Sequence, residues 1–179
     1  MQRRTKIAVL GAVLLLSTGA TGSAMAYGTE GHPRHEAAAL TGTAKLYRVA
    51  GDDITFTFDA HLAAKDHADP LKATGTFRWS HYANGEGGWA KARVDCLVTG
   101  GKVAVVSGVI TDTDLDGVKG HRVGISVHDT GGVDRLGYSW AASGDMGPKD
   151  LPKCVSSAPF EKVKKGTGDF KVVPWHPDF

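Results

Sequence analysis

The chain has 179 residues, with 21 Lys or Arg against 19 Asp or Glu and a formal net charge of +2 at pH 7. This length suits one domain with a substantial core, and so small a basic excess argues against nucleic acid as a partner. Beyond the N-terminal region no apolar run is long enough to cross a bilayer, so no membrane span is expected in the mature chain.

The first 26 residues have the pattern of a secretory signal peptide. A basic segment with Arg3 and Arg4 precedes a short apolar run (7–16), and a small-residue region ends at Ala26. We expect cleavage after Ala26 and export by the general secretory route, with the twin-arginine route as the alternative. Cleavage removes three basic residues and no acidic ones, so the net charge falls from +2 to −1. The mature protein is therefore expected to be secreted and extracellular.

Residues 27–40 are rich in Gly, Pro and His and predict a flexible N-terminal arm, whereas residues 41–179 predict a single β domain. In that domain apolar and polar residues alternate with the period of a strand. The expected strands are 41–49, 54–62, 72–82, 90–98, 102–111, 122–128 and 136–140, with 168–173 as a candidate eighth.

Short connections between these runs leave no room for crossover helices, so the strands must pair antiparallel. The fold class is therefore predicted to be all-β. It is a single antiparallel β-barrel or barrel-like sandwich of about seven or eight strands, with an irregular C-terminal segment tied by a disulfide.

The two cysteines, Cys96 and Cys154, predict that disulfide, because the chain is expected to reach an oxidising compartment. Cys96 shares its alternation with Val94 and Val98, on the face that we expect to be buried. Cys154 follows the Pro-rich segment 147–152, so the bridge would pin an irregular stretch to the sheet. Closing a loop of this length contributes about 4 kcal/mol in the chain-entropy model.

Several motifs together, among them GDDITFTFDAHL, VDCLVTGG and GHRVGISVHD, resemble small secreted actinobacterial proteins that are often labelled repetin-like. The similarity covers nearly all of the mature chain. The resemblance implies an exported all-β domain, and it implies neither an activity nor any catalytic residue.

A run of alternating aspartates before Gly117 resembles the first half of a calcium-binding loop. The second half is missing, because Val123 stands where a bidentate Glu is expected. The alternative is an exposed polar hairpin tip, in which Asp is favoured by turn chemistry. Calcium is the one cofactor considered. Its candidate ligands are Asp112, Asp114 and Asp116, with Asp129 and Asp134 of the next turn as additional ligands.

Catalytic signals are weak. Residues 137–141 are close to G-x-S-x-G, but the last glycine and the strand-to-helix context are missing. The eight histidines are scattered, a pattern that solvent-exposed faces explain more simply than a transition-metal site. We therefore expect no enzyme, and keep a hydrolase with a dispersed site as an alternative.

Aromatic residues can line a sugar or apolar-ligand site, or they can fill the core. Trp79, Tyr138 and Trp140 share the alternation of apolar neighbours, which favours core filling. The expected function is a secreted, non-catalytic binding or structural domain, monomeric, with an unknown extracellular or cell-surface ligand; a calcium-stabilised extracellular module is another alternative. The aromatic candidates are Trp79, Tyr82, Trp89, Tyr138, Trp140 and Trp175.

Overall fold

The computed structural model describes residues 36–140, 151–156 and 161–177. The chain divides into a unit of residues 1–32 and a unit of residues 33–179, and every described residue belongs to the second. The predicted signal peptide (1–26) lies outside the described residues, as does most of the predicted arm.

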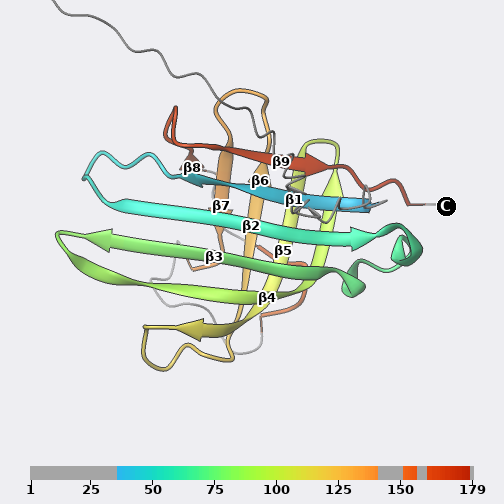
Figure 1. The fold of residues 1–179 in the computed structure, drawn as a ribbon, viewed down its shortest axis with the longest axis horizontal. Coiled ribbons are helices and arrows are strands. Elements are labelled where there is room, and N and C mark those ends of the chain that lie inside the picture. The colour runs from blue at the N-terminus through green and yellow to red at the C-terminus, as the bar shows by residue number, and fades with distance from the viewer. Residues whose placement is uncertain (1–35, 141–150, 157–160, 178–179) are drawn as a thin grey trace, which may run out of the picture. The chain divides into compact units, whose positions relative to one another are not determined.

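In the described residues nine antiparallel strands form one sheet in the order β8-β7-β6-β5-β4-β3-β2-β1-β9, which confirms the predicted all-β class (Figure 1). Two one-turn 3-10 helices join β2 to β3. None of the described segments is a helix long and apolar enough to cross a membrane. The elements are β1 (Glu36–Lys45), β2 (Asp53–Ala63), η1 (Ala64–Asp66), η2 (Pro70–Lys72), β3 (Thr74–Ala83), β4 (Glu86–Gly100), β5 (Val103–Thr113), β6 (Arg122–His128), β7 (Arg135–Tyr138), β8 (Glu161–Lys162) and β9 (Asp169–Val173).

Strand β1 begins earlier than the sequence predicts. Residues 36–40, which were assigned to the flexible arm, pair with the end of β2. Ala38 and Leu40 are fully buried there, because this stretch alternates into the core. The expected boundary between arm and domain at residue 41 is therefore wrong by at least five residues.

The sheet curls so that β1, β2, β3 and β9 run across β5, β6 and β7 (Figure 1). The long strand β4 belongs to both parts, and it carries a bulge at Asp95. Val94 pairs with Gly108 and Cys96 pairs with Ser107, so Asp95 has no partner of its own. Because a bulge bends its strand and increases the local twist, Asp95 marks the corner where the sheet turns over its own core.

The bulge also places Cys96 on a different face of the sheet from the predicted one. Before it, Val94 faces the core; after it, Leu97 does, and Cys96 points to the opposite face. Cys96 is nevertheless fully buried, because residues 151–156 cover it from outside. The expected common face of Val94, Cys96 and Val98 thus ends at the bulge.

Residues 151–156 cross the outer face of the sheet and are tied to it by the predicted Cys96–Cys154 disulfide. The Cys154 N–H donates to Ser107 Oγ at 3.0 Å, and Arg122 Nη1 donates to the Leu151 carbonyl at 2.9 Å. Of the predicted irregular segment 147–152, only the last two residues are described, and they have no regular structure.

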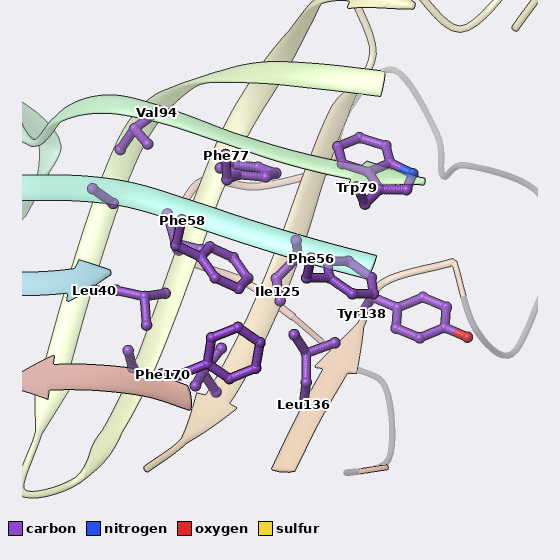
Figure 2. Close-up of a cluster of buried hydrophobic side chains, with 14 of the residues drawn as sticks. Leu40, Phe56, Phe58, Phe77, Trp79, Val94, Ile125, Leu136, Tyr138 and Phe170 are labelled. Carbon is purple, nitrogen blue, oxygen red and sulfur yellow. The ribbon is translucent and has the colours of Figure 1, made fainter. Parts of the chain in front are cut away.

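The core lies between the two crossing parts of the sheet (Figure 2). It is built around aromatic rings from β2, β3 and β9, and rings from different strands contact one another edge to face or tilted. Phe58 lies at its centre, with ring centroids 6.1 Å from Phe77 and 5.3 Å from Phe170. Side chains from β6 and β7, such as Ile125 and Leu136, close the cluster from the other side.

Residues 161–173 join the two edges of the curled sheet. Strand β8 pairs with β7, and the Val163 N–H donates to the Asp134 carbonyl at 2.9 Å. One residue later the Lys164 N–H donates to the Lys45 carbonyl of β1 at 2.7 Å. Strand β9 then continues along β1. The same short stretch of chain therefore reaches both edges, and we call it the seam (residues 161–173).

Candidate functional site

The β3–β4 hairpin extends past the end of the core. Its turn has two residues, Asn84 and Gly85, with φ of +52° and +84°. Positive φ at both positions is the type I′ geometry that matches the twist of paired strands. The predicted turn over residues 84–88 is thus shorter, and residues 86–88 are strand. Alternate side chains of β3 share one face, so the face that covers the core also carries side chains where the hairpin projects beyond the core.

On that face lies a pocket of about 500 Å³, which we call the hairpin pocket. It combines aromatic and aliphatic walls with a few polar side chains at its rim. Its lining residues are Trp79, His81, Ala83, Asn84, Glu86, Gly87, Gly88, Leu115 and Trp140.

One wall of the hairpin pocket comes from the turn after β5. Asp114 Oδ1 accepts the Trp89 N–H at 2.6 Å, and this bond places the next residue, Leu115, against the hairpin. Gly88 permits the contact, because a Cβ there would lie 2.5 Å from Leu115 Cδ2. Asp114 therefore has a structural role in the pocket wall.

The base of the pocket is a group of packed aromatic rings. The Trp140 ring centroid lies 4.8 Å from that of Trp79 and 4.8 Å from that of Tyr138. Arg48 Nη2 donates to the Tyr138 hydroxyl at 2.6 Å and also binds Glu161. Burial and the negative charge of Glu161 raise the pKa of Tyr138, so its hydroxyl remains protonated. These contacts fix the rings that support Trp140.

Trp79 carries a buried donor without an acceptor. Its side chain is only 2% exposed, and in the described part of the chain no atom accepts a hydrogen bond from Nε1. Figure 2 shows this nitrogen on the side of the ring that faces away from Phe77. An unsatisfied buried N–H costs about 1–3 kcal/mol, and such groups are rare enough to require an explanation.

The charges around the hairpin pocket are acidic. Glu86 lies at the rim and is exposed, and His81 Nε2 lies 3.1 Å from Asp52 Oδ2. Among the described residues that line the pocket, none is Lys or Arg. An anionic ligand would therefore meet carboxylates and no cationic partner apart from a protonated histidine.

The predicted calcium ligands do not come together. Asp112 lies in β5 opposite Lys91, Asp116 is exposed in the following turn, and Asp114 binds the Trp89 N–H. Across residues 36–140, 151–156 and 161–177, no three His, Cys, Asp or Glu side chains converge where they could hold a metal ion.

The two additional ligands lie elsewhere. The aspartate turn leads into Arg122 at one end of β6, whereas Asp129 follows the other end, about 20 Å away at the rise of a strand. Asp129 Oδ2 accepts from Val172 N–H at 3.3 Å, and Asp134 Oδ2 accepts from Phe170 N–H at 2.8 Å. The expectation that these carboxylates share an ion with the aspartate turn is therefore wrong, because they bind the seam.

Two carboxyls near the seam have shifted acidities. Burial by itself would raise the pKa of Asp129, but hydrogen bonds from Lys102 and from two backbone N–H groups outweigh it and leave the pKa below its usual value. The pKa of Asp169 is raised, chiefly because its carboxyl shares a hydrogen bond with Asp134 and secondly by burial.

The histidines that the structure describes do not form one cluster. His61 pairs with Thr74 near one end of the β2–β3 ladder, whereas His81 pairs with Ile54 near the other. His61 lies between two carboxylates, with Nδ1 2.6 Å from Glu36 Oε1 and Nε2 2.7 Å from Asp59 Oδ1. His32 and His35, also weighed in the sequence, lie outside the described residues.

The remaining candidates have local structural roles. Ser139 Oγ accepts the Gly124 N–H at 3.2 Å. Trp175 Nε1 donates to the His67 carbonyl at 2.7 Å, and Arg78 lies over the Trp89 ring at 4.6 Å. Tyr82 is partly exposed beyond the core.

The sequence pattern favours core filling for Trp79 and Trp140, with a ligand site as the alternative. It does not predict His81, Glu86 or Leu115 as residues that line a pocket with them. The signal that could have found His81 is its alternation with Trp79, which continues the inner face of β3 into the projecting hairpin. Leu115 gave no such signal, because a long-range bond from Asp114 positions it.

No protein-family model, no curated protein and no solved structure matches the chain.

Proposed function

We propose that this protein is a secreted, non-catalytic β domain that binds a small ligand in the hairpin pocket. The observation that carries the proposal is the buried, unpartnered Nε1 of Trp79 beside a partly apolar pocket. Binding sites of this kind combine apolar walls with a few polar groups that orient the ligand. A ligand oxygen at Nε1 would supply the acceptor that the fold leaves out.

Export is supported by the signal-peptide pattern of residues 1–26 and by the Cys96–Cys154 disulfide. The packed aromatic rings at the base of the pocket hold its floor in place. A preformed site loses little conformational entropy when a ligand binds, which favours affinity for a small molecule. The ligand is therefore expected to come from the extracellular medium or the cell surface.

The test is a ligand-observed NMR screen of the disulfide-bonded protein against small neutral, cationic and anionic ring compounds. Binding should depend on Trp140, whose ring lines the pocket. Trp140→Ala should abolish the signal of true ligands. Trp175→Ala is the matched control, because Trp175 binds His67 instead and does not line the hairpin pocket. A screen without any Trp140-dependent ligand would refute the proposal.

A further inference from the structure

We infer that the hairpin pocket takes an uncharged sugar ring, an inference that rests on the proposed function and names its ligand class. Three features of the pocket converge on this chemistry: an unpartnered donor, an acidic surrounding and an aromatic wall. The first favours a ligand with an acceptor, the second disfavours anions, and the third favours a ring with one apolar face.

The donor favours ligands that carry an acceptor. Trp79 Nε1 can only donate, so the group that satisfies it must have an oxygen or nitrogen lone pair. A quaternary ammonium ion could contact the ring faces of Trp79 and Trp140 and the carboxylate of Glu86, but it would leave Nε1 unpaired. A purely hydrocarbon ligand would leave the same N–H buried without a partner.

The surrounding charge excludes anionic acceptors. Glu86 lies at the rim, and Asp52 Oδ2 lies 3.1 Å from Nε2 of the lining residue His81. Asp114 is close to the lining residue Gly88, because a Cβ there would lie 2.7 Å from Asp114 Oδ1. These carboxylates repel an anionic ligand in the pocket, and no Lys or Arg among the described lining residues offsets the repulsion. The acceptor must therefore be neutral: a hydroxyl, a ring ether or an amide oxygen.

The walls favour a ring with one apolar face. Trp140 is partly exposed and is supported from behind by Tyr138, so it offers a fixed aromatic surface. A sugar ring places its C–H groups against such a surface and directs its hydroxyls outward. The Asn84 amide and the His81 ring lie at the rim and can exchange hydrogen bonds with those hydroxyls. A volume of about 500 Å³ lies within the usual range for small-molecule pockets.

The experiment titrates the disulfide-bonded protein with three neutral disaccharides (maltose, cellobiose and N,N′-diacetylchitobiose), with digalacturonate and with choline. Ligand-observed NMR and tryptophan fluorescence report binding. At least one neutral disaccharide should bind in the millimolar range or tighter, and digalacturonate should bind at least about tenfold more weakly. Trp140→Ala should weaken the neutral sugar by about tenfold or more, whereas Trp175→Ala should leave its affinity unchanged.

A second variant tests the charge argument without touching the core. Glu86 is exposed, so Glu86→Lys should fold normally and should strengthen digalacturonate binding by about tenfold. Equal or preferred binding of digalacturonate by the unmodified protein would overturn the sugar inference, and so would Trp140-dependent binding of choline alone. In both cases the pocket would still be a binding site. If no neutral disaccharide binds at the site, the sugar inference is overturned. The NMR screen of neutral, cationic and anionic ring compounds then decides whether the pocket binds any small ligand.

Discussion

The turns after β5 and after β6 are both rich in aspartate, yet they occupy different environments. Asp112, Asp114 and Asp116 are exposed, and Asp114 shapes the wall of the hairpin pocket through its bond to the Trp89 N–H. Asp129 and Asp134 are 7% and 1% exposed, and their carboxylates accept backbone N–H groups from β9.

The difference follows from what each turn must satisfy. Water can solvate the exposed carboxylates of the first turn, where Asp is favoured by turn chemistry, so they do not depend on buried protein donors. The second turn lies against the outer edge of β9, where the N–H groups of Phe170 and Val172 point away from β1 and have no neighbouring strand. Buried backbone donors need acceptors, and here two side chains supply them in place of a strand.

The largest expected effect is at Asp134. Asp134→Ala removes the acceptor of both the Phe170 and the Thr130 N–H groups, and it should lower the free energy of unfolding by about 3 kcal/mol. Urea denaturation measures the loss. Asp116→Ala, in the exposed turn, is the control and should change stability by less than about 0.5 kcal/mol. Equal losses in the two variants would erase the distinction between the turns.

Acid should weaken the buried turn selectively. The pKa of Asp129 is lowered in the folded state, so the stability it contributes is present above its unfolded pKa and is lost as pH falls through the folded value. The loss should therefore begin below about pH 5, where an unfolded Asp starts to take up protons, and should grow as the pH falls further. Asp129→Asn should reduce the acid sensitivity measured by denaturation at several pH values. A variant with an unchanged pH slope would contradict the assignment.

A smaller effect is expected at Asp114. Asp114→Ala loses one hydrogen bond to the Trp89 N–H, which should cost about 1 kcal/mol, and the loosened Leu115 should weaken ligand binding in the hairpin pocket. Thermal melts in millimolar calcium and in chelator should be superimposable. A calcium-dependent rise in Tm that Asp114→Ala abolishes would instead restore the calcium loop.

The smallest effect has the opposite sign. The pKa of Asp169 is raised because its carboxyl lies against that of Asp134, so the stability that its protonated form contributes is lost as pH rises through the folded pKa. At neutral pH, Asp169→Asn keeps a donor toward Asp134 and removes the repulsion. It should raise stability by up to about 0.5 kcal/mol, since Asp169 is exposed. This gain should disappear near pH 3, where the native carboxyl is protonated.

Local alternation was sufficient to predict most of the sheet. The predicted strand 122–128 coincides with β6, and the predicted 54–62 differs from β2 by one residue at each end. Both strands alternate regularly and end in turn residues, so the pattern carries the whole signal. The predicted disulfide is formed as well.

Features that depend on distant partners were not predictable in this way. The two-residue strand β8 exists because Arg135 and Leu136 are beside it, and the bulge at Asp95 exists because Arg122 and Ser107 bind its carboxylate. A period of two cannot signal a bulge, since the extra residue reverses the alternation without a change in residue type. The candidate site has the same origin, because its wall and base come from segments far apart in the sequence.

The pairing of β1 with β9 has a consequence for biosynthesis. On one edge β1 pairs with β2, but on the other edge residues 39–43 pair with residues 169–173, so during translation that second edge stays open until nearly the whole sheet has been made. Contacts between such distant residues slow folding, and an open strand edge can pair with another chain. Chains stopped short of β9 should therefore associate with one another, and the cell must keep the nascent protein from doing so until the last strand arrives.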